Sequence, residues 1–134
     1  YFQFITSSTI IFNPLFVSNC FAFGLMITGI AVMFAAIKNY DWKGFTGIAE
    51  ERHYALVIAG MNKYVRHPLY TGTMLFVIGF FIWQPFLKNL LFMILILVYL
   101  VIGIMLEERK LVQQYGEYYK QYQKRVKKMI PFIW

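Results

Sequence analysis

Several residues that could bind an anion lie close together in the middle of the chain. Arg66 and His67 come directly before Pro68, and Tyr70 and Gly72 follow. Because proline fits the first turn of a helix, Arg66 and His67 are expected at or beside a helix N-cap, where free N–H groups and the helix dipole attract anions. His67 and Tyr70 share a helix face, and Gly72 leaves room beside them. The pattern predicts a pocket for a carboxylate or phosphate group. The alternative is an arginine that reaches lipid phosphates at a membrane surface.

A pair of acids, Glu107 and Glu108, follows a long apolar stretch. Acidic residues near a helix C-terminus oppose the helix dipole, and burying their charge at a membrane boundary is costly. One interpretation is that Arg109, Lys110 and water neutralise them. The other is that the carboxylates accept hydrogen bonds from hydroxyl or ammonium groups of a ligand. Opposite the cationic cluster, this pair suits a zwitterionic ligand that also carries sugar hydroxyls.

The composition indicates a membrane protein. Of 134 residues, 60% are apolar, 20% aromatic and 14% charged, which is too apolar for a soluble domain of this size or for a disordered chain. The net charge of +7 is confined to polar segments between apolar runs, which argues against a nucleic-acid partner. The single cysteine, Cys20, excludes an intrachain disulfide. Neither histidine has a second ligand three or four residues further along, so no metal site is expected.

The chain is expected to form one all-α integral membrane domain over residues 1–134, with three to four transmembrane helices. Three apolar runs are candidate spans, because a helix needs about 20 apolar residues to cross a bilayer. They cover residues 15–37, 69–86 and 90–106. The short linker between the last two predicts an antiparallel helical hairpin, which would bring the two charged clusters together. Residues 1–13 are interpreted as part of an earlier span, an interfacial segment or the remainder of a tag.

Two polar segments flank these spans. All but one of the 13 basic residues lie in a loop over residues 38–66 or in the tail over residues 107–128. Three spans place both segments on one side of the membrane, and their basic residues predict that this side, with the active site, faces the cytoplasm. Helical spacing of the tail's apolar residues predicts an amphipathic helix with an aromatic face and a basic face. Such a helix could lie on anionic lipid, cover a site at the membrane edge, or do both.

A set of motifs runs in order along most of the chain. It consists of Leu56-Val57-Ile58-Ala59-Gly60, Val65-Arg66-His67-Pro68-Leu69-Tyr70-Thr71-Gly72, Glu107-Glu108, Tyr115-Gly116-Glu117-Tyr118-Tyr119 with Tyr122, and Ile130-Pro131. These motifs resemble the isoprenylcysteine carboxyl methyltransferase family, and related phospholipid methyltransferases share much of the pattern. The resemblance covers about residues 15–134.

The resemblance implies a small membrane enzyme that uses S-adenosyl-L-methionine as its methyl donor. It implies that His67 and Tyr70 contact this cofactor and that Arg66 and Pro68 shape its pocket. The cofactor-binding residues that it suggests are Leu56, Val57, Asn62, His67, Pro68, Leu69, Tyr70 and Gly72. The catalytic residues that it suggests are Arg66, Glu107 and Glu108.

Two departures from the family pattern bear on the methyl acceptor. Asn62 stands where the family often has tyrosine, and Gly103 stands where the isoprenylcysteine enzymes carry an arginine that helps to hold substrate. The expected acceptor is therefore lipidic, or small and apolar. Methyl transfer by in-line displacement depends mainly on positioning and on exclusion of water. An amine or hydroxyl acceptor would also need a base, for which His67 or Glu108 could serve.

Two other function classes remain open. Sterol reductases have a related membrane architecture with a similar arginine, proline, tyrosine and acidic-pair pattern, but they use NADPH. The 2′-phosphate of that cofactor would need more basic residues around the pocket. A non-catalytic membrane module would bind no cofactor at all.

Overall fold

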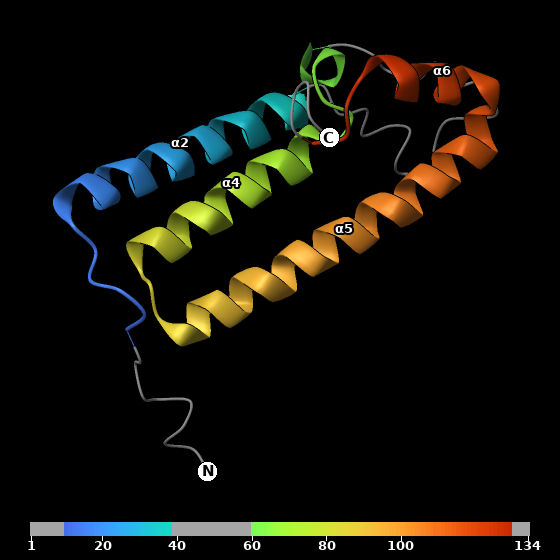
Figure 1. Cartoon of the computed structure of the whole chain (residues 1–134). Helices are drawn as coiled ribbons and strands as arrows, with labels where there is room; N and C mark the ends of the chain where they lie inside the picture. Colours follow the sequence, from blue (N-terminus) through green and yellow to red (C-terminus); the bar gives the residue numbers. More distant parts are fainter. Residues whose placement is uncertain (1–9, 39–59, 130–134) are drawn as a thin grey trace.

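The computed structural model describes residues 10–38 and 60–129, and these residues are mostly helical (Figure 1). The elements, in chain order, are α2 (Phe16–Lys38), the 3-10 helix η1 (Gly60–Lys63), α4 (Pro68–Trp83), α5 (Leu87–Tyr115) and α6 (Glu117–Arg125). Within the described ranges no strand forms, and β-pairing is limited to two isolated bridges. The all-α class that the sequence predicts is confirmed.

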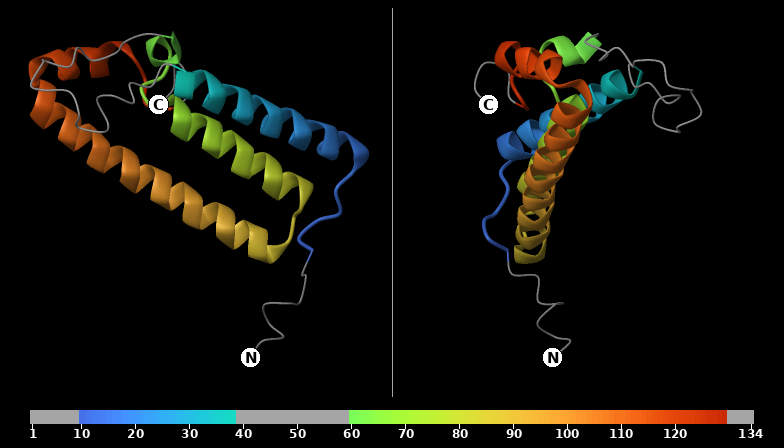
Figure 2. Two further views of the ribbon diagram at one scale, coloured as in Figure 1. Left: turned by 180° about the vertical axis from the view of Figure 1, so that it is seen from behind. Right: turned by 90° about the vertical axis from the view of Figure 1, so that its right-hand side faces the viewer.

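Two of the helices are long and apolar enough to cross a membrane, judged by length and composition. They are α2, with 23 residues, and α5, with 29. α4 is a shorter apolar helix of 16 residues. The three helices lie side by side, with α4 antiparallel to both α2 and α5 (Figures 1 and 2). Many large apolar side chains of α2 and α5 are exposed, which suits helices surrounded by lipid.

Small residues bring α2 and α4 into close contact. A Cβ added to Gly72 would lie 2.7 Å from the carbonyl oxygen of Gly29, and one added to Gly79 would lie 2.7 Å from the carbonyl oxygen of Ala22. No side chain tolerates such distances, so glycine at these positions lets the two backbones approach. This packing holds the start of α4 firmly against α2.

The turn between α4 and α5 is short, as the hairpin prediction requires. α4 ends at Trp83 and α5 begins at Leu87, with Pro85 buried between them. The N–H of Ile11 donates to the carbonyl of Pro85 at 2.8 Å. Ile10 and Ile11 therefore lie against this turn, and residues 10–15 are not helical. The rest of the N-terminal segment lies outside the described residues.

α5 differs from the prediction at its C-terminal end. The sequence predicts a span over 90–106 and a separate tail helix over 107–128, but α5 continues without a break to Tyr115. Glutamate, arginine and lysine are good helix formers, so the change to a charged sequence does not end the helix. At about 1.5 Å per residue α5 is about 44 Å long, which exceeds the roughly 30 Å of a hydrocarbon core. It ends at Gly116, whose φ of 58° favours glycine, and α6 then turns back over the end of the bundle (Figure 1).

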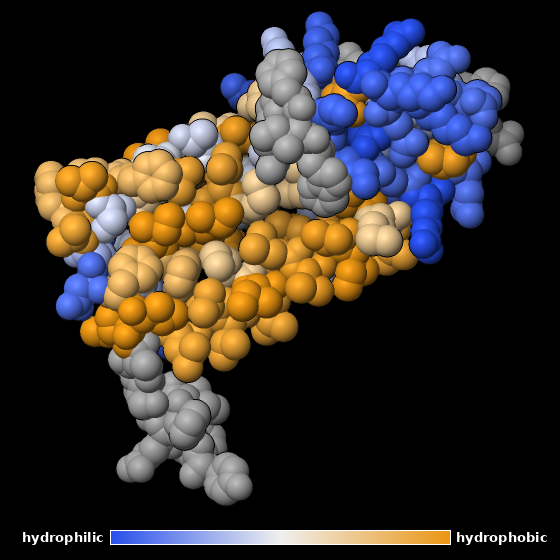
Figure 3. All heavy atoms as spheres, in the orientation of Figure 1, coloured by the Kyte–Doolittle hydropathy of each residue, from blue (hydrophilic) through white to orange (hydrophobic). Residues whose placement is uncertain are grey.

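Polar side chains gather at one end of the molecule (Figure 3). The last turns of α5, the whole of α6, η1 and the first turn of α4 meet there, whereas apolar side chains cover the lengths of the helices. Residues 60–66 and 107–128 of the two polar segments lie at the same end of the helix bundle. Residues 39–59 of the predicted loop lie outside the described residues.

Candidate functional site

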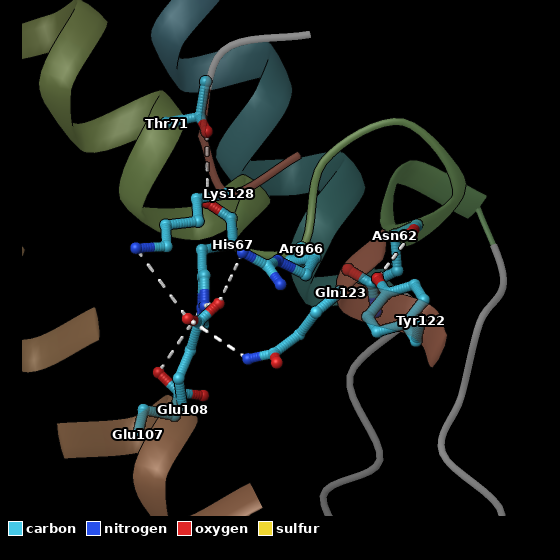
Figure 4. Close-up of polar contacts among 9 residues, drawn as sticks. All are labelled: Asn62, Arg66, His67, Thr71, Glu107, Glu108, Tyr122, Gln123 and Lys128. Atoms are coloured by element: carbon cyan, nitrogen blue, oxygen red, sulfur yellow. Dashed lines mark hydrogen bonds and ion pairs between the residues drawn. The ribbon is translucent and has the colours of Figure 1, made fainter. Parts of the chain in front are cut away.

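Glu108 is the centre of a polar network that joins α4, α5 and the tail (Figure 4). Its Oε1 lies 2.9 Å from Nη2 of Arg66 and 3.2 Å from Nε2 of His67. Its Oε2 accepts a hydrogen bond from Gln123 at 3.4 Å and lies 4.0 Å from Nζ of Lys128. The side chains of Arg66 and Glu108 are only 6% and 11% exposed. The two clusters predicted from the sequence therefore meet, but they bind each other directly.

His67 lies between two carboxylates of α5. Its Nε2 faces Glu108, and its Nδ1 lies 3.6 Å from Oε2 of Glu107. The imidazole is 3% exposed, whereas the side chain of Glu107 is 45% exposed. Arg109 and Lys110, the neutralising partners considered above, are exposed, while both acids face α4. The surroundings of His67 suit a hydrogen-bond donor or a cation better than the carboxylate or phosphate that the sequence predicts.

Residues 126–129, which we call the C-terminal strap, pair with the start of α4. Three carbonyl groups of the strap accept hydrogen bonds there. The pairs are Arg66 N–H to Lys127 (2.8 Å), His67 N–H to Lys128 (3.0 Å) and Thr71 Oγ1 to Met129 (2.8 Å). Met129 is buried against α5 beside Leu100 and Ile104, so the strap bridges both helices. The backbone N–H groups of Arg66 and His67, which lie just before the predicted anion-binding helix start, are thus bonded to the strap.

Tyr70 and Gly72 occupy different sides of α4. The Tyr70 ring packs edge-to-face on His67, with centroids 5.6 Å apart, so the predicted shared face is confirmed. The ring also reaches α5, where a Cβ added to Gly103 would lie 3.4 Å from both Cε1 and Oη of Tyr70. Gly72 instead faces α2, and Met33 fills the space beside it. This differs from the expectation that Gly72 leaves room for a ligand, because helix packing uses that room.

The tail places an aromatic cluster beside the network. Tyr119, Tyr122 and Val126 are buried and pack against Leu111, Val112 and Tyr115 of α5. The hydroxyl of Tyr122 donates to the carbonyl of Asn62 at 2.6 Å, which ties α6 to η1. Burial raises the pKa of Tyr122 to about 12 and raises the pKa of Tyr119 as well, so both phenols stay neutral at physiological pH. The predicted aromatic face is confirmed, and it packs against the last turns of α5.

An open groove of about 440 Å³ lies between α5 and α6. Its lining residues are Met105, Glu108, Arg109, Val112, Gln113 and Gln123. The groove combines an acid, a base, two amides and apolar side chains, which is the mixture that a polar ligand with an apolar part would need. Glu108 lines this groove and also holds Arg66 and His67, so it connects the groove with the start of α4.

Comparison with known proteins identifies the family of this chain. The sequence profile of the phospholipid methyltransferase family matches residues 17–118. The chain belongs to this family. A methanethiol S-methyltransferase of Crocosphaera subtropica is 32% identical over 123 residues, which cover 86% of this chain and 46% of that protein.

Two further relatives match shorter regions. Methanethiol S-methyltransferase 1 of Bradyrhizobium diazoefficiens is 40% identical over 74 residues, covering 54% of this chain and 25% of that protein. A protein-S-isoprenylcysteine O-methyltransferase of Schizosaccharomyces pombe is 35% identical over 96 residues, covering 64% of this chain and 38% of that protein. The chain spans between a quarter and about half of the length of these curated relatives. No solved structure matches it significantly.

The phospholipid methyltransferase match ends inside α6, so the strap lies beyond it. The remaining residues that the sequence predicts for the cofactor pocket differ in their exposure and contacts. Pro68 is buried at the start of α4, whereas Leu69 beside it is exposed. Asn62 contributes its backbone carbonyl to Tyr122. Leu56 and Val57 lie outside the described residues.

The sequence analysis missed Gln123 and Lys128 as partners of Glu108, and Thr71 as the anchor of the strap. The spacing of the tail suggested a helix that covers the site, but it did not show which polar residues point inward. The inward direction depends on the turn at Gly116, which sets how α6 crosses α5.

Proposed function

We propose that this chain forms the membrane part of an S-adenosyl-L-methionine-dependent methyltransferase that acts on a small or lipidic apolar acceptor. The observation that carries the proposal is the junction of Arg66 and His67 with Glu107 and Glu108 at the polar end of an apolar helix bundle. Family membership supplies the reaction class. The NADPH-dependent reductase considered above is not favoured, because the relatives described here are named methyltransferases.

The residues at this junction fit S-adenosyl-L-methionine, which supplies an electrophilic methyl group when bound. Nε of Arg66 is buried and has no hydrogen-bond partner among the described residues, so it can donate to a carboxylate. Glu107 is half exposed and can accept hydrogen bonds from an ammonium group or from sugar hydroxyls. Donor and acceptor therefore stand on opposite sides of His67, which matches a zwitterionic ligand.

The residues of this chain would position the methyl donor and exclude water from it. Arg66 orients a carboxylate at the start of α4, and the ring of Tyr70 with His67 forms one wall of the site. The buried aromatic cluster of α6 packs against the last turns of α5, and the side chains of Arg66 and His67 are almost wholly removed from solvent. In-line displacement requires these two contributions more than acid–base chemistry. Six further residues stay predicted to contribute to cofactor binding: Leu56, Val57, Asn62, Pro68, Leu69 and Gly72. Pro68 and Gly72 would contribute through helix packing.

A small thiol is the first acceptor to test. The relative aligned over 86% of this chain is named for methyl transfer to methanethiol. Gly103 beside Tyr70 leaves no cation on that face of α5 for an acceptor's carboxylate. An acceptor of this kind partitions into lipid, which also acts as a partner of the exposed apolar helices. The basic residues of the polar end support placement of the site on the cytoplasmic side.

Binding and turnover of the purified protein in lipid nanodiscs test the proposal. Calorimetric titration should show binding of S-adenosyl-L-methionine and S-adenosylhomocysteine, and none of NADPH. His67→Ala should weaken this binding by about 1–3 kcal/mol, as expected for loss of a hydrogen bond that involves a charged group. Gly24→Ala is the matched control, because nothing lies within 4 Å of a Cβ at that position. A protein that binds NADPH but binds neither S-adenosyl-L-methionine nor S-adenosylhomocysteine would contradict the proposal.

A further inference from the structure

We infer that His67 is the base that removes a proton from the methyl acceptor, with Nδ1 as the accepting atom and Glu108 as the residue that positions the ring. The inference rests on the proposed function and deepens it, because it applies to acceptors that carry a proton, such as thiols and amines. It also gives Glu107 a separate role, the transfer of that proton to solvent.

The contacts of Glu108 fix the tautomer of His67. A carboxyl group paired with a buried guanidinium at 2.9 Å is ionised, and an ionised carboxylate only accepts hydrogen bonds. Nε2 of His67 lies 3.2 Å from the same oxygen, so Nε2 must carry the hydrogen. In neutral imidazole the other nitrogen then holds a lone pair. Nδ1 of His67 is therefore the proton-accepting atom.

The position of Glu107 agrees with a lone pair on Nδ1. The 3.6 Å between Nδ1 and Oε2 of Glu107 is longer than a hydrogen bond, as expected when neither atom carries a hydrogen. A donor group placed between these atoms would be attracted to both of them. Once Nδ1 is protonated, the imidazolium is attracted to carboxylates on both sides. The arrangement thus stabilises the charged form that a base acquires during the reaction.

The proposed step balances for a thiol acceptor. The S–H bond of the acceptor breaks and its proton goes to Nδ1 of His67. The acceptor sulfur forms the new S–C bond while the carbon–sulfur bond of the methyl donor breaks, and the electron pair of that bond stays with the donor sulfur. Glu107 then takes the proton from Nδ1 and releases it to water through its exposed carboxylate. A base is useful because the thiolate, and not the neutral thiol, is the nucleophile.

Several charged and titratable groups surround this pair. Glu107 and Glu108 come from α5, Arg66 precedes His67 in the sequence, and Tyr70 contacts the imidazole from the first turn of α4. The tail adds Lys128 of the strap and the buried phenol of Tyr119. Each belongs to an element packed on the imidazole or on its carboxylate partners. A pH profile of the base therefore reports on this set as a whole.

The tautomer can be measured without turnover. The chain contains only two histidines, so ¹⁵N spectra of the ring nitrogens are simple, and His53→Gln assigns the remaining signals to His67. We expect the neutral imidazole of His67 to carry its hydrogen on Nε2. A ring protonated on Nδ1 would overturn the inference whatever the enzyme does.

Turnover of two acceptors gives the second measurement. A thiol must lose a proton, whereas the carboxylate of a farnesylcysteine analogue is already ionised. His67→Gln should slow thiol methylation by about 100-fold or more at saturating methyl donor, the usual contribution of a general base. Glu107→Gln should slow it by a smaller factor. In both variants, with the methyl donor saturating, the rate for the thiol should fall by a larger factor than the rate for the carboxylate. The loss for the thiol should shrink as the pH approaches the pKa of the acceptor, because more thiolate is then present.

Glu117→Gln is the matched control, since this acid is exposed on α6 and pairs only with Lys120 among the contacts described. Equal losses for both acceptors in His67→Gln would show a binding or structural role and overturn the inference. An unmodified protein that binds no methyl donor and methylates neither acceptor would instead contradict the proposed function. The ¹⁵N spectra decide the tautomer in that case as well.

Discussion

The guanidinium of Arg66 and the carboxylate of Glu108 form an ion pair of 2.9 Å that is almost wholly removed from solvent. It joins the segment just before α4 to the last turns of α5, within a polar network that also contains His67, Gln123 and Lys128. Removing one partner of a buried pair leaves an uncompensated charge, which costs far more than losing an exposed pair.

Glu108→Ala should therefore lower the free energy of unfolding by about 3–5 kcal/mol. Unfolding in mixed micelles, followed by tryptophan fluorescence, measures this change. Lys120→Ala removes an exposed pair with Glu117 and should leave the stability unchanged. A Glu108→Ala variant as stable as the unmodified protein would show that solvent or lipid headgroups replace the lost partner.

The contact between α2 and α4 predicts the effect of adding single methyl groups. Gly72→Ala places a Cβ 2.7 Å from the carbonyl oxygen of Gly29, so the helices must separate. We expect a loss of about 1–3 kcal/mol, the usual range for overpacking. Gly24→Ala on the open side of α2 should be neutral or slightly stabilising, because alanine favours helices. Thermal unfolding of the two variants in the same detergent compares them directly, and equal stability would contradict the packing described.

High pH should destabilise the polar end of the molecule. The folded state raises the pKa of Tyr122 from 10.0 to about 12, so it binds the phenolic proton more tightly than the unfolded chain does. The stabilisation is complete below pH 10.0 and is lost as the pH rises towards 12. Unfolding midpoints measured across this window should fall, and Tyr122→Phe should make that fall less steep. The same slope in both proteins would show that Tyr122 does not contribute.

Gly103 should control the position of Tyr70. An alanine there makes only an ordinary contact at 3.4 Å, so Gly103→Ala should keep the site and stabilise α5 by about 0.5–1 kcal/mol. Gly103→Leu should push the Tyr70 ring away from His67, because the larger side chain needs the space that the ring occupies. The ring-current shift of His67 in NMR spectra reports that contact, and an unchanged shift in Gly103→Leu would contradict the arrangement.

Labelling of single cysteines tests the sidedness of the site. In a Cys20→Ser background, which removes the exposed native thiol, Lys120→Cys lies at the polar end and Lys88→Cys at the opposite turn. A membrane-impermeant maleimide should label Lys120→Cys only from the cytoplasmic side and Lys88→Cys only from the other. Labelling of both from one side would exclude a spanning α5.

The sequence predicted the helices better than their ends. The lengths of the three apolar runs predicted the three long helices and the short turn at Pro85, because a long apolar run in a membrane has few other ways to fold. The predicted helix end at Leu106 was wrong, because hydropathy falls there while helix propensity stays high. α5 continues to Tyr115. Gly116, with its positive φ, marks the true break.

The residues of the candidate site could be predicted from the sequence, but most of the hydrogen bonds between them could not. The hairpin indicated that Arg66 and His67 meet the acidic pair, and they do. The hydrogen bonds from the N–H groups of Arg66 and His67 to the strap could not be predicted, because a bond between two backbone groups does not depend on residue type. The role of Gly72 was misread for a related reason, since a glycine looks the same whether a ligand or a helix fills the space beside it.

The strap has a consequence for how the protein is made. Thr71 and Met129, which it joins, lie 58 positions apart in the chain. Helices α2, α4 and α5 precede the strap in the chain and carry exposed apolar side chains, so lipid can surround them before the strap pairs with the start of α4. A chain halted after α6 would then be fully embedded and yet lack the backbone partners of Arg66 and His67. Embedding of the helices in lipid and completion of the proposed site are thus separate events in the folding of this chain.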